Sequence, residues 1–390
     1  MTLFDVVTRT DASPSAYGED SFSFMNRVDG PFWTRVRLVL DEWFANYPEE
    51  HAADLRARLR SSDPRQHYAA WWELYLHELF LKIGWSVSVH PDVGGASTHP
   101  DFLVRRGADA FYLEALTVFS GIVEDGRNGA REAWILDLIN EVTSPNFFVG
   151  VDFESVGTEC PSRAEVIQPI EGWLAGLDAD AVAELMRAGD EPPELRLQFR
   201  DWDVVVDAMP IKPDARGRAD NRTVGRGPVS GGWVNDVDQL RRGFKRKFRR
   251  YGELEHPLAV AVLGMSSFVE LRDFEQALFG RHAVQYEQQA PYRSQWVRLA
   301  DGVWRGPAGP RATSVAGVLS AAGIQPWTTV RGLPRLWVNP WAVRPLGVRL
   351  PFPTTTVSEA GEVEHGEGGI SAADIFDLPA DWPGPEDAFE

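Results

Sequence analysis

The first third of the chain begins with three stretches whose apolar residues repeat at helical spacing. Residues 31–47 predict a helix, because Pro31 suits a first helical turn and an apolar stripe follows it. Residues 49–61 predict a second, highly charged helix. Residues 64–83 predict a third with one apolar face. The N-terminal part is therefore expected to be helical.

The hydrophobic period then changes to two, which is typical of strands. Residues 85–89 alternate in this way, and residues 101–104 and 111–119 predict two further strands joined by the tight turn RRGADA. Much later, residues 236–251 predict a helix and residues 258–263 an apolar strand. This order predicts an α/β fold with an αβββ…αβ arrangement.

The remaining regions are less regular and suggest how the chain is divided. Residues 163–189 predict a helix, and residues 212–232, which are rich in Gly, Arg and Pro, predict a loop. Residues 271–280 predict a short helix, and residues 286–350 are rich in Trp, Gly and Pro. The expected segments are an N-terminal helical segment (1–63), a core (64–119 and 235–285), an insertion (120–234), a Trp-rich C-terminal extension (286–353) and an acidic, largely flexible tail (354–390).

The net charge of −18 over 390 residues is unevenly distributed. Residues 358–390 contain ten acids and neither Lys nor Arg, whereas residues 241–250 contain seven basic residues. Because the local field decides what a surface attracts, the acidic total does not exclude a nucleic-acid partner. We expect the acidic tail to contact the basic helix within the molecule, unless Phe376 and Trp382 dock it elsewhere.

Composition excludes several classes of protein. The single cysteine, Cys160, rules out an internal disulfide framework and a cysteine-based zinc site. The N-terminal residues do not resemble a signal peptide, and no apolar stretch of about 18 residues predicts a membrane span. The sequence has neither a phosphate-binding GxxxxGK[ST] loop nor a GxGxxG fingerprint. A cytoplasmic location without a membrane partner is therefore expected.

Two acids interrupt the predicted strands. Asp101 begins the second strand and Glu114 lies in the third, so the hairpin between these strands would bring the two carboxylates together. Two neighbouring carboxylates repel each other and need a compensating cation. Hard oxygen ligands favour Mg²⁺, or Mn²⁺ in its place. The pair therefore predicts a metal site on the hairpin.

The motifs around these acids resemble the PD-(D/E)xK nuclease superfamily. The doublet Pro100-Asp101 matches its Pro-Asp motif, and Glu114 matches its hairpin acid. Glu73 lies eleven positions before the glycine that opens the first strand, where many members carry a helix glutamate. The resemblance covers residues 64–119 and 236–264, and the wider pattern also looks like a group of uncharacterised bacterial proteins.

This resemblance implies a fold and an activity. The fold is a restriction-endonuclease-like αβββαβ core, here with a large insertion and a C-terminal extension. The activity is metal-dependent hydrolysis of DNA phosphodiester bonds, in defence or repair. The resemblance also implies that Asp101, Glu114 and Glu73 hold the metal and take part in catalysis.

The sequence departs from the superfamily pattern at one position. The pattern has a lysine two residues after the glutamate, where it would orient the attacking water and stabilise charge on the phosphate, and this chain has Leu116. In the helix 236–251, Lys247 points within about 60° of the apolar stripe and therefore faces the fold. We expect it to pair with Glu114 or Asp101 and to take the catalytic role of the missing lysine. Lys247-x-x-x-Tyr251 also lies where some members carry Gln-x-x-x-Tyr.

The other cations of this helix are expected to lie on its outer side. Four of them would contact DNA phosphates without reading the base sequence. These four are Arg242, Lys245, Arg246 and Arg249. Arg241 is assigned to the same outer side by the helical phase.

Each assignment has a structural alternative. Asp101 can cap a turn, Glu73 can be a solvated helix residue, and Lys247 can extend its stem along an apolar surface. The outer cations can form an ordinary solvated face. Leu116 favours an alternative function, in which a catalytically inactive nuclease fold binds nucleic acid or protein. DNA and RNA are not distinguished by these patterns, and neither is the oligomeric state.

Overall fold

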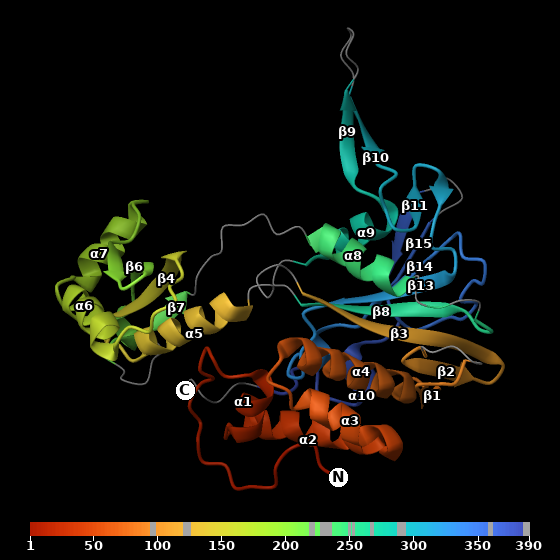
Figure 1. Ribbon diagram of the computed structural model, residues 1–390, viewed down its shortest axis with the longest axis horizontal. Coiled ribbons are helices and arrows are strands. Elements are labelled where there is room, and N and C mark those ends of the chain that lie inside the picture. Colours follow the sequence, from red (N-terminus) through yellow and green to blue (C-terminus); the bar gives the residue numbers. More distant parts are fainter. Residues whose placement is uncertain are drawn as a thin grey trace. The chain divides into compact units, whose positions relative to one another are not determined.

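The computed structural model divides the chain into two compact units (Figure 1). The first comprises residues 1–13, 20–120 and 235–390, and the second comprises residues 14–19 and 121–234. The residues that the structure describes are 1–93, 99–119, 126–217, 223–226, 236–248, 251, 254–265, 269–286, 294–357 and 362–384.

The first unit is built on an eight-stranded mixed sheet. In sheet order its strands are β1 (Ser86–Val89), β2 (Phe102–Arg106), β3 (Asp109–Phe119), β8 (Leu258–Met265), β13 (Val315–Ala322), β14 (Arg335–Val338), β15 (Thr354–Val357) and β16 (Val363–Gly366). Strands β1, β2 and β3 are antiparallel neighbours, whereas β3, β8 and β13 run parallel. Both faces of the parallel part are buried, as parallel strands require.

Helices cover the two faces of this sheet (Figure 1). One face packs on a helical layer made of α1 (Ser21–Arg27), α2 (Pro31–Asn46), α3 (Glu49–Leu59), α4 (Pro64–Lys82) and α10 (Ala372–Phe376). The other face packs on α8 (Asp236–Phe248) and α9 (Leu271–Phe279). Among the helices of the described residues, none is both long and apolar enough to span a membrane.

Helix α4 is buried on nearly all sides. Asp63 caps its first turn by accepting a hydrogen bond from the Arg65 backbone N–H. Its side chains are buried from position 67 to 80, except at one half-buried alanine. The indoles of Trp71 and Trp72 donate hydrogen bonds at 3.0 Å to the carbonyl oxygens of Ile324 and Ala261. Helix α4 is therefore buried over more of its surface than the single apolar face predicted from the sequence, because other helices cover its opposite side as well.

Helix α8 is amphipathic and lies unusually close to β3. Leu240, Phe244 and Phe248 are buried against the sheet. A Cβ atom at Gly243 would lie 3.0 Å from the Val118 side chain and 3.3 Å from that of Leu116. The absence of a side chain at this glycine therefore lets the helix backbone approach the strand, which brings the residues one turn further on within reach of β3.

The second unit has its own sheet and core. Its strands are ordered β5 (Glu194–Phe199), β6 (Trp202–Pro210), β4 (Phe147–Ser155) and β7 (Val224–Arg226), and its helices are α5 (Gly126–Asn140), α6 (Arg163–Ala175) and α7 (Ala179–Arg187). The predicted helix over 163–189 is divided in two, because Asp178 caps a new helix with its side chain. Part of the predicted loop 212–232 forms the 3-10 turn η2 (Pro213–Ala215) and the strand β7.

The C-terminal third differs most from the sequence-based expectation. The predicted extension, 286–353, contributes β13 and β14 to the middle of the main sheet, because the apolar run of β13 pairs in parallel with β8. This segment also includes the hairpin strand β10 (Ser294–Arg298), which pairs with β9 (His282–Tyr286). Its smallest elements are β11 (Arg305–Gly306), β12 (Gly309–Pro310) and the 3-10 turn η3 (Thr329–Arg331).

The prediction of a largely flexible tail over 354–390 is wrong for its described residues. They form β15, β16 and α10. Phe376 packs against Trp43 and Tyr75, with ring centroids 4.7 and 5.4 Å apart, and Trp382 is also buried. Burial of these apolar side chains on α2 and α4 outweighs the repulsion among the acids. The expected docking of the tail on the basic helix is replaced, in this part, by docking on the opposite side of the sheet.

Candidate active site

The candidate site lies where β2 stops and β3 continues. The pairing between these strands ends at Phe102 and Leu113, and β3 runs on to Phe119 with β8 along its other edge. At this point the carboxylate of Asp101 accepts a hydrogen bond from the Ala115 backbone N–H at 2.6 Å. Asp101 therefore binds the edge of β3, fourteen residues further along the chain, and this contact is not the turn cap considered as its structural alternative.

Asp101 and Glu114 lie on neighbouring segments and on the same face of the sheet. The register of Phe102 with Leu113, continued by one residue, sets Asp101 opposite Glu114. Side chains alternate along a strand, and Leu103 packs in the core that includes α8. Glu114 therefore faces α8, and Asp101, which directly precedes β2, lies close enough for the two carboxylates to interact, as the hairpin predicted.

Glu114 is completely buried and hydrogen-bonded from two directions. Its Oε1 accepts from Lys247 Nζ and its Oε2 from the hydroxyl of Tyr251. The Tyr251 hydroxyl also lies 3.0 Å from the carbonyl oxygen of His99. A buried carboxylate needs such partners to stay charged. The inward orientation of Lys247 deduced from helical phase is confirmed, and its side chain is only 16% exposed.

Glu73 approaches the site from the other side of the sheet, on α4. Arg58 of α3 binds it with both arms, Nη1 to Oε1 and Nη2 to Oε2, each at 2.7 Å. Both carboxylate oxygens are therefore engaged in a forked ion pair. Sequence reasoning missed Arg58, because the helix 49–61 carries many charges and nothing in its period distinguishes this arginine.

The charge state of Asp101 is perturbed by its surroundings. Burial, together with the negative charges of Glu114 and Glu73, raises the pKa of Asp101 to about 7, although Lys247 and the Ala115 N–H act in the opposite direction. Anions that crowd a third carboxylate make its charged form costly. A cation bound between the carboxylates would relieve that cost.

A pocket of about 200 Å³ lies at this edge of the sheet, between helices α4 and α8. It is lined by residues of α4, β3 and α8 together with Asp101. These residues are Ala69, Trp72, Glu73, Asp101, Ala115, Leu116, Thr117, Arg246 and Lys247. Two of the three predicted acids and the predicted lysine thus border one pocket, and Glu114 lies directly behind Lys247.

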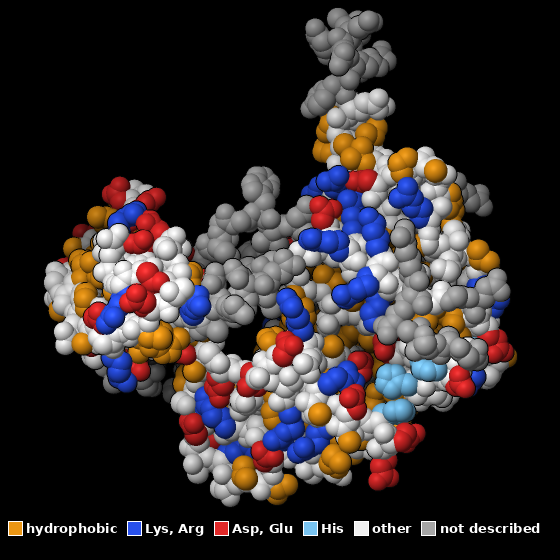
Figure 2. Space-filling view, viewed as in Figure 1, with side chains coloured by type: hydrophobic (Ala, Val, Ile, Leu, Met, Phe, Trp, Pro, Cys, Tyr) orange, Lys and Arg blue, Asp and Glu red, His pale blue; other side chains and the backbone are white. Residues whose placement is uncertain are grey.

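Basic side chains gather over α8 beside this pocket (Figure 2). Arg242, Lys245 and Arg246 are exposed, as their helical phase predicted. Arg249 lies outside the described residues. The prediction that Arg241 lies on the outer side of the helix is wrong. Arg241 is buried and forms an ion pair with Asp301 at 2.8 Å, because α9 and the chain after β10 cover that side of the helix.

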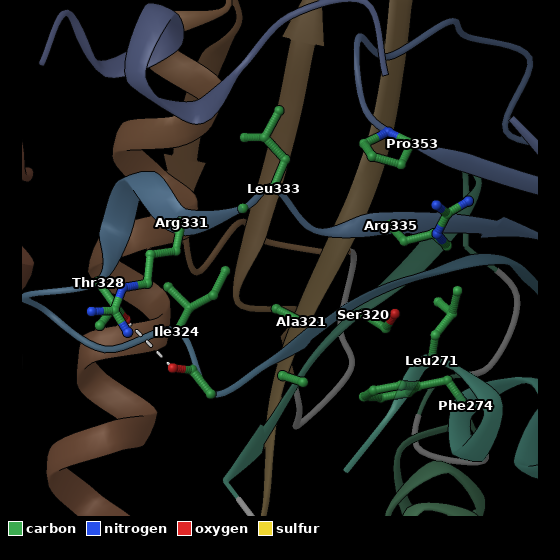
Figure 3. A pocket seen from close by; sticks show the side chains of 13 residues that line it. Leu271, Phe274, Ser320, Ala321, Ile324, Thr328, Arg331, Leu333, Arg335 and Pro353 are labelled. Carbon is green, nitrogen blue, oxygen red and sulfur yellow. Dashed lines mark hydrogen bonds between the residues drawn. The ribbon is translucent and has the colours of Figure 1, made fainter. Parts of the chain in front are cut away.

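A second, larger pocket lies at the end of β13 (Figure 3). Its volume is about 530 Å³. Figure 3 shows Arg331 beside Thr328 at one end and Arg335 near Pro353 at the other, with Leu333 between them. The described residues that line it include no carboxylate and no histidine. Of these two pockets, only the smaller one is lined by carboxylates.

Asp101 and Glu114 are the acids that best fit the divalent metal predicted from the sequence. No group of three Asp, Glu, His or Cys side chains suited to holding a metal occurs among the described residues. Glu73 fits poorly as a ligand, because one rigid guanidinium, that of Arg58, binds both of its oxygens. Both oxygens of Glu114 also accept hydrogen bonds, but from two separate groups, so a metal would displace only one of them. Asp101 and Glu114 therefore fit better, since Mg²⁺ is often held by one or two carboxylates and completed by water. The raised pKa of Asp101 is consistent with a cation-binding position.

Comparison with protein-family models, with curated proteins and with solved structures found no match to this chain.

Proposed function

We propose that this protein is a metal-dependent nuclease that hydrolyses DNA phosphodiester bonds at the pocket beside Asp101. The observation that carries the proposal is the contact of Lys247 with Glu114 next to Asp101. A cation from helix α8 reaches the face of the hairpin from which the missing lysine would have projected. On this proposal, Lys247 supplies from another element the cation that the superfamily pattern places two residues after the glutamate.

The arrangement of the core supports the same proposal. Helix α4, the antiparallel strands β1 to β3, helix α8 and strand β8 follow one another around the insertion, and β8 lies parallel to β3. This is the αβββαβ order of a restriction-endonuclease-like core, which we propose for residues 64–119 and 236–265. Strands β13 to β16 then extend the sheet beyond it.

The residues of the pocket would have different roles in the reaction. Mg²⁺ or Mn²⁺ held by Asp101 and Glu114 would supply Lewis-acid polarisation of a phosphate oxygen and would acidify water. The Lys247 ammonium would stabilise negative charge that develops on the phosphate. Tyr251 would hold the Glu114 carboxylate in place, and Arg246 would bind a flanking phosphate at the mouth of the pocket.

A second candidate function has its own supporting observation. Glu114 already has two hydrogen-bonding partners, Glu73 has a forked one, and Leu116 fills the usual lysine position. A site whose acids are neutralised by the protein can bind DNA phosphates without hydrolysing them. This second candidate is a nuclease fold that serves as a binding module.

A cleavage assay distinguishes the two functions. Single-stranded, double-stranded and branched DNA are incubated with the protein in Mg²⁺, in Mn²⁺ and in EDTA. The proposal expects cleavage only with metal, and its loss by about 10²-fold or more in Asp101→Asn. A matched control, Asp109→Asn, changes an exposed acid at the start of β3 and should cleave normally. DNA binding without cleavage in either metal would establish the binding module.

A further inference from the structure

The hairpin of β9 and β10 projects from the first unit (Figure 1). Trp296 on β10 is 74% exposed and pairs in register with Val284 on β9. Exposure of this degree is unusual for tryptophan, and Trp304, only eight residues later, is fully buried. An isolated exposed apolar side chain needs no explanation, but an indole held out on a strand offers a large flat surface to a partner.

The foot of the hairpin is tightly fixed. The Leu299 N–H donates to the Arg281 carbonyl at 2.8 Å, and Arg298 forms an ion pair with Glu275 of α9. A Cβ atom at Gly280 would lie only 1.9 Å from the Leu299 carbonyl oxygen, so the two strands approach there as only glycine allows. The indole is therefore presented from an anchored base.

Ion pairs connect the foot of the hairpin to α9 and α8. Trp296 and Arg298 are two residues apart, so they share one face, and Arg298 reaches back to α9. Asp301 bridges Arg281 at the foot of the hairpin to Arg241 of α8. Figure 2 shows the basic side chains of this region gathered below the hairpin.

The described strands of the hairpin carry no carboxylate, in a chain with 57 acids. A partner that suits both the indole and the cations must therefore combine anionic groups with flat apolar rings. A single nucleic-acid strand has this combination, because its phosphates alternate with unpaired bases. In a duplex the base faces are already covered by their neighbours.

We propose that the β9–β10 hairpin is a nucleic-acid-binding arm, in which Trp296 stacks on an unpaired base while Arg242 and Lys245 of α8 contact the phosphates. This inference rests on the proposed function and names its substrate class, DNA that has a single-stranded segment. Stacking of bases on aromatic side chains is tolerant of sequence. The arm would therefore recognise the absence of pairing and not a particular base.

Binding of a labelled oligothymidine and of a duplex of equal length tests the proposal. Fluorescence anisotropy is measured in EDTA, so that no cleavage intervenes. Trp296→Ala should weaken binding of the single strand about 5- to 100-fold and of the duplex far less. Trp296→Phe should restore part of the affinity. Leu38→Ala, which removes an exposed side chain on α2, is the matched control and should bind normally.

Three results would contradict the proposal of a nucleic-acid-binding arm. The first is unchanged binding of the single strand by Trp296→Ala, and the second is an equal loss of affinity for the single strand and the duplex. The third is a change from dimer to monomer in Trp296→Ala without a change in affinity. The last outcome would make the hairpin a contact between two copies of the chain.

A separate readout distinguishes failure of the arm from failure of the nuclease. Hydrolysis of bis(p-nitrophenyl) phosphate in Mn²⁺ needs the pocket but offers no strand to the arm. Loss of oligothymidine binding in Trp296→Ala with unchanged hydrolysis of this small diester supports both proposals. Loss of binding in a protein that never hydrolyses the diester supports the arm and contradicts the nuclease.

Discussion

Two buried acids of this molecule are neutralised in different ways. Glu73, on the α4 side of the sheet, is held by the planar fork of Arg58 at two equal distances of 2.7 Å. Glu114, on the α8 side, is held by the compact ammonium of Lys247 and by a tyrosine hydroxyl. An arginine fork matches both oxygens of one carboxylate, whereas the three donors of a lysine ammonium turn together about one bond at the end of a flexible stem.

The difference indicates which acid is structural and which can do chemistry. The Glu73–Arg58 pair joins two helices, and one rigid group binds both carboxylate oxygens. The Glu114–Lys247 pair lies beside Asp101, whose pKa is raised, and its ammonium can turn toward an incoming phosphate. The α4 side of the sheet would then provide stability and the α8 side catalysis.

Removal of Lys247 should have the largest effect. Lys247→Ala is expected to lower turnover at saturating DNA by about 10²–10³-fold, since one group at the developing charge contributes roughly 3–4 kcal/mol. Lys247→Arg should not restore the rate, because a planar guanidinium replaces a compact ammonium. The exposed Lys245→Ala is the matched control, with weaker binding, a shallower salt dependence and little change in the saturated rate.

The expected loss can also come from misfolding, because Lys247→Ala leaves Glu114 buried without its cation. The double variant Lys247→Met/Glu114→Gln replaces the ion pair by neutral groups and should recover most of the stability. It should remain inactive. Lys247→Ala that cleaves as fast as the parent would contradict the migrated-lysine mechanism.

Removal of Arg58 should affect stability and leave chemistry largely unchanged. Arg58→Ala is expected to lower the free energy of unfolding by about 3 kcal/mol, because Glu73 is left buried and unneutralised. Urea denaturation measures this loss, and Glu73→Gln in the same background should reduce it. A stable Arg58→Ala protein that has lost all turnover would reverse the assignment of the two pairs.

A buried histidine on the α4 side of the sheet should also make the stability of the protein depend on pH. His77 packs against Tyr47 and Phe102, and burial lowers its pKa from 6.5 to about 4. The unfolded chain then binds a proton that the folded chain does not, so stability falls as pH drops from 6.5 toward 4. The loss for this group is roughly 3 kcal/mol at most.

Thermal denaturation at pH 7 and at pH 5 checks this prediction. On the change from pH 7 to pH 5, His77→Phe should lose less stability than the parent. The difference that remains is a balance, because the lowered pKa of His67 costs stability at pH 5 whereas the raised pKa of Asp101 adds stability there. An equal difference in the variant and the parent would show that His77 does not titrate in this range.

The smallest expected effect is a rescue. Leu116 occupies the usual lysine position, on the same face as Glu114 and against α8. Adding Leu116→Lys to Lys247→Ala should recover turnover by roughly tenfold, since the new ammonium reaches the same acid but displaces an apolar side chain from the core. Recovery is measured as single-turnover cleavage. A double variant no faster than Lys247→Ala would mean that the helix position is essential.

The local elements of the fold are largely predictable from the sequence. Spacing and turn residues predict helices α2, α3, α4 and α9 and strands β2 and β3 within a few positions. The central place of β13 is not predictable in this way, because a short apolar run does not reveal its partner. The docking of Phe376 on Trp43 likewise depends on surfaces far apart in the chain.

The site shows the same limit. The helical phase was enough to direct Lys247 inward, because Leu240, Phe244 and Phe248 define the buried side of α8. The same phase wrongly predicted that Arg241 is exposed, because its surroundings are set by α9 and Asp301. It could not reveal Arg58, because the partner of Glu73 comes from another helix.

The most direct test compares one isosteric change in each of the two acid pairs. Single-turnover cleavage of DNA is measured with Mg²⁺ and saturating protein for Glu114→Gln and Glu73→Gln. The account predicts that Glu114→Gln loses about 10²-fold or more, because a neutral amide neither holds the metal nor positions the Lys247 ammonium. Glu73→Gln should keep a rate close to that of the parent. An equal or larger loss in Glu73→Gln, with Glu114→Gln active, would contradict it.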